Sequence, residues 1–193
     1  MFVVTRVREI AFVYGQYRRG DMEQAASQVT SQIARQIEAL KVLIVVDEPA
    51  MRKVTRSLLQ AIGVKNIHDA PDGRSGLEAI CALAPDIVIL DWEMPAPNGA
   101  EFMRQVRSPR DFPLPAVPVI MLTGYSERSR VVAAVRLGVN EFLLKPVSTK
   151  ALLARVVNIL TNPRRWCKRA TTTDRSRASS RATSRKPIPA RST

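Results

Sequence analysis

The residues of this sequence best suited to chemistry are two acids, a hydroxyl and a lysine, each at the end of a short apolar run. They are Asp47, Asp91, Thr123 and Lys145. Neighbouring carboxylates can hold Mg²⁺, which prefers hard oxygen ligands and keeps several waters. The metal can neutralise charge on an incoming phosphoryl group, while a lysine and a hydroxyl bind its oxygens. A carboxylate nucleophile then forms an aspartyl phosphate, so this set of residues indicates phosphoryl transfer to a carboxylate.

The elements that must position these residues alternate between short β-branched runs and stretches of helical periodicity. The predicted strands are Val42–Val46, Lys65–Ala70, Asp86–Asp91, Val117–Leu122 and Glu141–Leu144. The predicted helices are Ala50–Ile62, Gly73–Leu83, Ala100–Val106, Ser126–Leu137 and Thr149–Leu160. This alternation predicts an α/β fold in which helices cover both faces of a parallel sheet. Ligands of such sheets bind beyond the carboxyl ends of the strands, where the four candidate site residues also lie.

Four segments, in order, resemble the motifs of receiver domains of bacterial two-component response regulators. They are Val42–Arg52, Pro85–Pro95, Val119–Gly124 and Phe142–Pro146. The resemblance covers residues 41–161 and implies a flavodoxin-like (βα)5 fold with a doubly wound, five-stranded parallel sheet. It also implies a single-domain response regulator, phosphorylated by a histidine kinase or phosphotransfer protein, that signals by contact with an output protein.

The resemblance assigns a role to each matching residue. Asp91 is the expected phosphoacceptor. The expected ligands of Mg²⁺ are Asp47, Asp91 and the backbone carbonyl of Glu93. Thr123 matches the switch hydroxyl, and Lys145 matches the cation that senses the phosphate.

Three further positions match the family pattern. Phe142 matches an aromatic residue that changes rotamer on activation, and the peptide bond before Pro146 matches one that is commonly cis. Gly124 matches a position where a small residue leaves the site open. Beyond Mg²⁺-dependent self-phosphorylation from a donor and slow autodephosphorylation, the resemblance implies no enzyme activity.

One position departs from the family pattern. Receivers have an acidic pair where an alignment on Pro49 and Arg52 places Val46 and Asp47. The missing acid is the one that orients a metal-bound water, and such outer partners matter by about 10–100-fold in metal affinity or activity. We therefore expect weaker Mg²⁺ binding, with Glu48 as a candidate for partial compensation.

Residues 1–40 form an N-terminal extension with a helix predicted at about 22–39. Asp21 is a candidate N-cap, and Gln24 follows three residues later. Apolar residues then recur every three or four positions, at Met22, Ala26, Val29, Ile33, Ile37 and Leu40. This face either packs on the receiver or pairs with another copy of the chain.

The net charge of +13 is concentrated at the end of the chain. Residues 163–193 hold ten basic side chains and one acidic one, against five and four in residues 1–40. A basic, Ser/Thr-rich end is typical of a solvated, disordered tail, although it can attract nucleic acid. The expected organisation is therefore an extension at 1–40, a receiver at 41–161 and a basic, disordered tail at 162–193. About thirty residues are too few for a DNA-binding or catalytic output domain.

Cysteine usage and hydropathy indicate the compartment. Cys81, expected in the core, and Cys167, in the tail, lie far apart and match neither a disulfide framework nor a metal-ligand spacing. No apolar run approaches the roughly 18–20 residues of a membrane span. We expect a cytoplasmic monomer or weak dimer, in which the single histidine, His68, is structural.

Three functions of different class remain open at this level. The first is the phosphorelay receiver. The second is a phosphate-independent binding module of receiver fold, suggested by Val46, in which Asp47 and Asp91 are only polar strand ends. The third is a nucleic-acid-associated regulator that acts through the basic tail.

Overall fold

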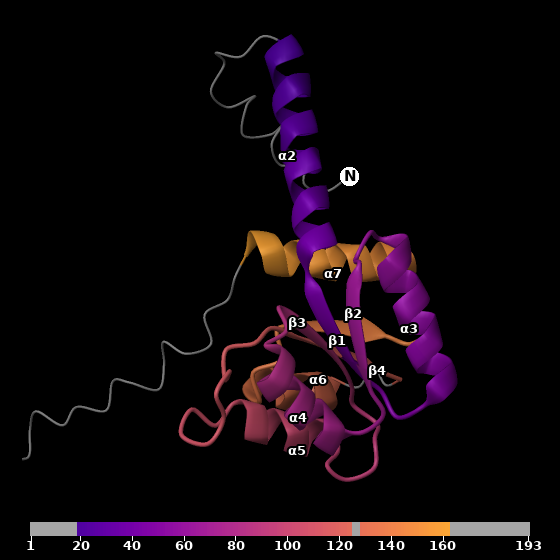
Figure 1. Cartoon of the computed structure of the whole chain (residues 1–193), viewed down its shortest axis with the longest axis vertical. Helices are drawn as coiled ribbons and strands as arrows, with labels where there is room; N and C mark the ends of the chain where they lie inside the picture. Colours follow the sequence, from indigo (N-terminus) through magenta and orange to yellow (C-terminus); the bar gives the residue numbers. More distant parts are fainter. Residues whose placement is uncertain (1–18, 125–127, 163–193) are drawn as a thin grey trace, which may run out of the picture.

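The structure, a computed structural model, describes residues 19–124 and 128–162. Five parallel strands form one sheet in the order β2-β1-β3-β4-β5 (Figure 1). The strands are β1 (Lys41–Val45), β2 (Asn66–Ala70), β3 (Ile87–Asp91), β4 (Val119–Thr123) and β5 (Glu141–Leu144). The predicted flavodoxin-like, doubly wound five-stranded fold is confirmed.

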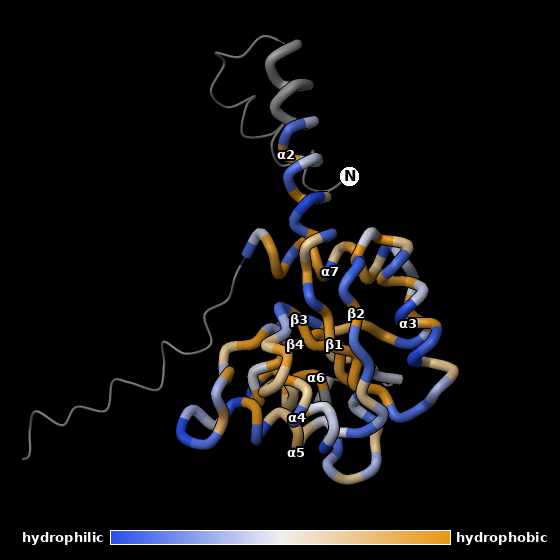
Figure 2. Tube along the Cα trace, in the orientation of Figure 1, coloured by the Kyte–Doolittle hydropathy of each residue, from blue (hydrophilic) through white to orange (hydrophobic). Residues whose placement is uncertain are grey.

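Helices cover both faces of this sheet. They are α2 (Arg19–Ala39), α3 (Pro49–Ala61), α4 (Gly73–Leu83), α5 (Gly99–Val106), α6 (Arg128–Arg136) and α7 (Thr149–Thr161). Buried residues of α4, α5 and α6 share one apolar cluster with the sheet, whereas those of α2, α3 and α7 share a second cluster on the opposite face. Figure 2 shows the apolar strands enclosed between the helices. Among the described residues, no helix combines the length and the hydropathy needed to span a membrane.

Strand β1 illustrates why the central strands are apolar at every position. Leu43 and Val45 point into the first cluster, Val42 and Ile44 point into the second, and all four are fully buried. Successive side chains of a strand point to opposite faces, so a strand covered on both sides needs an unbroken apolar run.

Strand β4 begins two residues later than predicted. Pro118 has no N–H to donate to a ladder, although its carbonyl accepts a hydrogen bond from the Val88 N–H at 2.9 Å. The strand also extends one residue further, to Thr123, which pairs with Leu144 of β5. Thr123 is therefore the last residue of the strand, and the sheet fixes its backbone.

Side-chain caps begin the two helices that follow β2 and β3. Asn98 Oδ1 accepts from the Ala100 and Glu101 N–H groups, and Glu101 accepts in return from the Asn98 N–H. Asp72 caps α4 in the same way and accepts from the Ser75 N–H at 2.8 Å, which holds the pKa of Asp72 below its usual value. These caps fix where the loops after the two strands end.

Helix α2 begins at Arg19, three residues before the predicted start, and projects away from the sheet (Figures 1 and 2). Its last turn packs against the body of the protein. Ile37 is 4% exposed and Leu40, which links α2 to β1, is 6% exposed; both belong to the second apolar cluster. Within the described part of the chain, α2 packs against α7.

Candidate phosphoacceptor site

Asp91 is a buried carboxylate at the carboxyl end of β3, with only 1% of its surface exposed. Its Oδ2 forms an ion pair with Lys145 Nζ at 2.6 Å, and its Oδ1 accepts a hydrogen bond from the Glu93 N–H at 3.0 Å. Burial of a carboxylate is costly unless a counter-charge and hydrogen bonds compensate it, and both oxygens of Asp91 have such a partner. The contacts hold the carboxylate, a group that can act as a nucleophile, at the end of the strand.

Thr123 and Lys145 reach the same rim from the two neighbouring strands. Thr123 ends β4, next to β3, and is 6% exposed. Its carbonyl accepts a hydrogen bond from the Lys145 N–H at 2.9 Å, which fixes the backbone that places the lysine beside Asp91. The Lys145–Pro146 peptide bond is cis. The structure thus brings the acid, the hydroxyl-bearing residue and the cation together at the ends of three consecutive strands of the sheet.

The end of β1 provides the other side of the rim. In the β1–β3 pairing Val45 lies opposite Leu90, so Asp47 follows β1 beside the strand that ends in Asp91. Asp47 is half-buried, whereas Glu48 is exposed and occupies the N-cap position of α3 without a side-chain capping bond.

Val46 is fully buried in the second apolar cluster. The position that carries an acid in the matching pattern is therefore part of the apolar core in this chain. Arg52, on the first turns of α3, donates to the carbonyl oxygens of Val46 at 2.6 Å and of Asp47 at 3.2 Å. The guanidinium holds the loop that presents Asp47, a contact that the sequence pattern did not indicate.

Comparison with known proteins identifies the family. A family model described as the response regulator receiver domain matches residues 42–157. The chain belongs to this family. The chemotaxis protein CheY of Pseudomonas aeruginosa is 32% identical over 120 residues, which cover 62% of this chain and 95% of that protein.

Solved structures of receiver domains share the fold. A response regulator from Chloroflexus aurantiacus superposes with a TM-score of 0.58 at 30% identity and covers 63% of this chain and 98% of its own. The chemotaxis protein CheY4 of Vibrio cholerae superposes with a TM-score of 0.56 at 28% identity, with 62% and 98% covered. Almost the whole of each solved receiver domain therefore has its counterpart in this chain.

The donor set of this receiver fits a magnesium ion, with one acid fewer than the family pattern. In the described ranges, no three side chains of His, Cys, Asp or Glu form a cluster that could hold a metal. Mg²⁺ is commonly bound through only one or two carboxylates and keeps several waters. Asp47, Asp91 and the backbone carbonyl of Glu93 are hard oxygen donors on neighbouring strand ends, and they are the residues that would hold the ion.

The side chain of Glu93 lies at the opposite side of Asp91, toward β4. A Cβ added to Gly124 would come within 3.4 Å of Glu93 Oε2. The glycine thus leaves the space next to Thr123 open, and the carboxylate of Glu93 borders that space. The sequence pattern assigned only the backbone of Glu93 and did not indicate this position of its side chain.

The loop after β3 is packed tightly against the start of α5. A Cβ at Gly99 would lie 2.8 Å from the Trp92 Cα and 3.0 Å from the Asp91 carbonyl oxygen. Trp92 and Phe142 are half-buried and pack against the first apolar cluster. The backbone on both sides of the phosphoacceptor position is consequently held by packing.

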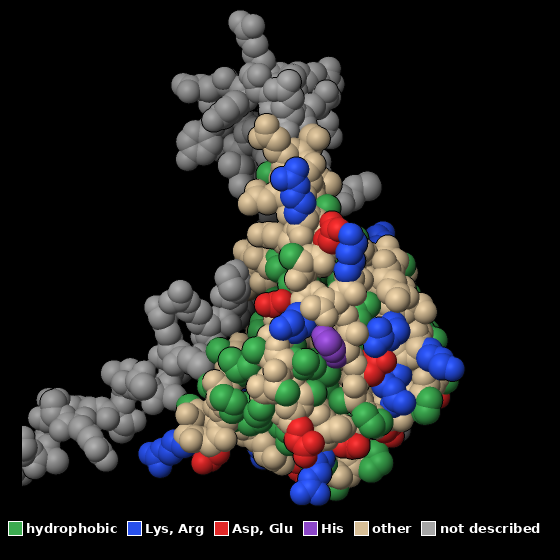
Figure 3. Space-filling view, in the orientation of Figure 1, with side chains coloured by type: hydrophobic (Ala, Val, Ile, Leu, Met, Phe, Trp, Pro, Cys, Tyr) green, Lys and Arg blue, Asp and Glu red, His purple; other side chains and the backbone are tan. Residues whose placement is uncertain are grey.

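Two residues lie away from the rim. His68 lies half-buried on the edge strand β2, on the face shown in Figure 3. Cys81 is exposed, and its expected place in the core was wrong. Helix α4 directs Gly76 and Ile80 toward the sheet, and one residue further along a helix the side chain is turned by about 100°.

Proposed function

We propose that this receiver accepts a phosphoryl group on Asp91 from a histidine kinase or phosphotransfer protein and signals through contact with an output protein. The supporting observation is the ion pair between Lys145 and the buried Asp91, next to Thr123 at the end of β4. The function places the chain in the cytoplasm, as a signalling module in a two-component phosphorelay.

Each residue of the site has a separate role in the proposed reaction. An oxygen of the Asp91 carboxylate attacks phosphorus, and the bond from phosphorus to the donor nitrogen breaks. Lys145 then pairs with a phosphoryl oxygen in place of the carboxylate oxygen that it holds in this structure, and the hydroxyl of Thr123 hydrogen-bonds another. Bound Mg²⁺ supplies neutralising charge for the phosphoryl oxygens.

Phosphorylation adds charge at Asp91, and this charge can change the surface that an output protein contacts. When Lys145 and Thr123 engage the phosphoryl group, the ends of β4 and β5 shift relative to Asp91. Phe142 lies three residues before Lys145 on β5 and is half-buried, so a change in this strand reaches an aromatic side chain at the surface. This biases a two-state surface that a partner can read.

Purified chain incubated with a phosphoramidate donor and Mg²⁺, and analysed by intact mass, tests the proposal. We expect one added phosphoryl group that requires Mg²⁺ and is lost in Asp91→Asn. Asp111→Asn, which changes an exposed loop acid, is the matched control and should be phosphorylated like the wild type. A folded protein that gains no phosphoryl group would contradict the proposal.

That negative outcome would favour the second candidate, a binding module that works without phosphate. The observation behind it is Val46, fully buried where the family pattern has an acid. The third candidate, a nucleic-acid-associated regulator, depends on residues 163–193, which lie outside the described residues. A steep salt dependence of RNA or DNA binding that disappears on deletion of these residues would support it.

A further inference from the structure

Helix α2 is attached to the receiver without a linker. Ala39 ends the helix, Lys41 begins β1, and the single residue between them, Leu40, is buried. Ile37 is buried one turn earlier, and Glu38 forms an ion pair with Lys65 at the start of the β2 edge. These contacts fix the direction in which the helix leaves the domain.

The helix carries an apolar line whose cover by the receiver decreases with distance from this anchor. Val29, Ile33, Ile37 and Leu40 follow one another at spacings of four, four and three residues, so they share one face. Ile37 and Leu40 are buried, and Ile33 packs at the margin of the second apolar cluster. Val29 is half-buried but belongs to neither cluster, and the helix backbone continues from it to Arg19.

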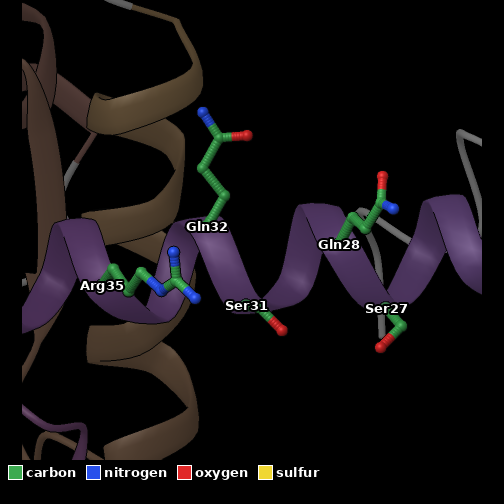
Figure 4. A pocket seen from close by; sticks show the side chains of 5 residues that line it. All are labelled: Ser27, Gln28, Ser31, Gln32 and Arg35. Atoms are coloured by element: carbon green, nitrogen blue, oxygen red, sulfur yellow. The ribbon is translucent and has the colours of Figure 1, made fainter.

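The side chains around this line are polar and uncharged. Residues 27–34 contain no charged side chain, although the whole chain has a net charge of +13. Figure 4 shows Gln28 and Gln32 on one side of the helix and Ser27 and Ser31 on the other, with Arg35 nearer the body. Gln28 and Gln32 each precede a residue of the apolar line, so they flank it.

This composition selects the partner. A helix segment that projects into water is marginal by itself, because most helical stability in proteins comes from packing of an apolar face. Nucleic acids and anionic membranes require lysines and arginines beside such a face, and residues 27–34 contain neither. In a two-fold symmetric contact the same patch of each copy faces the other, so an uncharged flank avoids like-charge repulsion. Glutamine amides both donate and accept, and they can therefore pair with themselves.

We propose that the projecting part of α2 is a self-association surface, on which α2 of a second copy of this chain packs along the line that begins with Val29 and Ile33. The anchored turn at Ile37 and Leu40 remains on its own receiver in the dimer. The pair joins two receivers through their extensions and leaves the carboxyl ends of both sheets accessible.

Sedimentation velocity on the full chain tests this surface with a matched pair of variants. Val29→Glu places a charge on the apolar line, while Ser31→Glu places the same charge on the opposite side of the helix. Glutamate is a good helix former, and at position 31 it is four residues from Arg35, so both helices should persist. Circular dichroism and thermal unfolding verify that each variant is folded.

We expect a dimer for the wild type and for Ser31→Glu, and an increase of about tenfold or more in the dimer dissociation constant for Val29→Glu. A wild type that sediments as a monomer at all accessible concentrations would overturn the proposal and indicate that the line is covered within one chain. Equal weakening by the two glutamates would also overturn it.

Discussion

The two sides of the rim around Asp91 differ in what supports them. On the side of β4 and β5, Thr123 and Lys145 match the receiver pattern; a backbone hydrogen bond joins these two residues, and an ion pair joins Lys145 to Asp91. On the side of β1, a core valine replaces one acid, and Asp47 follows it in a loop held by Arg52. Under the proposed function, this difference predicts that metal binding is the weaker half of the site and phosphoryl recognition the stronger half.

The largest expected effect comes from damaging the stronger side. Lys145→Met removes the counter-charge of a carboxylate that is 1% exposed and the cation that meets the phosphoryl oxygens. We expect phosphorylation from a small donor to slow by about 100-fold, the typical loss on removal of one preorganised electrostatic group. Intact mass recorded against time gives the rate.

Lys150→Met is the control for this substitution because Lys150 is an exposed lysine of α7. It should be phosphorylated at the rate of the wild type. Equal slowing in the two variants would remove the special role of Lys145.

The weaker side can be made to resemble the family pattern by Val46→Asp. We expect Mg²⁺ to bind about tenfold more tightly, since a second acid would orient metal-bound water. Because Val46 is fully buried in an apolar cluster, the same change should lower the free energy of unfolding by about 1–3 kcal/mol. Calorimetric Mg²⁺ titration and urea unfolding measure the two effects.

Val46→Asn separates these effects, because asparagine matches aspartate in shape but is uncharged. It should destabilise the fold to a similar extent without tightening Mg²⁺ binding. If Val46→Asp leaves the Mg²⁺ affinity unchanged, the missing acid does not explain the difference between the two sides.

A smaller effect is expected from Arg52→Met, which removes the two hydrogen bonds to the carbonyl oxygens of Val46 and Asp47. Hydrogen bonds that involve a charged group stabilise by about 1.5–3 kcal/mol. A looser loop should also present Asp47 less well, so Mg²⁺ affinity should fall while the contact between Lys145 and Asp91 persists. Lys53→Met, at the exposed neighbouring position, should change neither quantity in urea unfolding and calorimetry.

The smallest effect is expected from a substitution in α3, the helix that follows β1. Thr55 on α3 is 1% exposed, and its hydroxyl has no hydrogen-bond partner. Thr55→Val removes this unsatisfied group at nearly constant shape, so we expect a gain of about 1 kcal/mol in unfolding free energy with an unchanged phosphorylation rate. Thr55→Ser keeps the hydroxyl and should give no gain; a stabilised serine variant would contradict this explanation.

Much of the fold could be predicted because the central strands are covered on both faces and read as unbroken apolar runs. The end of β3 at Asp91 was predicted correctly, whereas the start of β4 was predicted two residues too early because Pro118 has no N–H to donate to the ladder. Cys81 was misplaced because an apolar residue beside a core position of a helix can still face solvent.

The geometry of the site was less accessible from the sequence. The four candidate site residues could be found because the carboxyl ends of parallel strands lie at one edge of the sheet. Arg52 and the carboxylate of Glu93 could not, since their positions depend on how a long side chain folds back over a loop, and no spacing in the sequence records that.

The direction of α2 relative to the strands has a consequence for access. The helix enters β1 at its amino end, whereas Asp91, Thr123 and Lys145 lie at or just beyond the carboxyl ends of their strands. Under the proposed function, a phosphoryl donor approaches the end of the sheet opposite to the helix. A protein bound to α2, at the amino end of β1, leaves the carboxyl ends of the strands accessible. An assembly held through α2 can therefore be phosphorylated without dissociating.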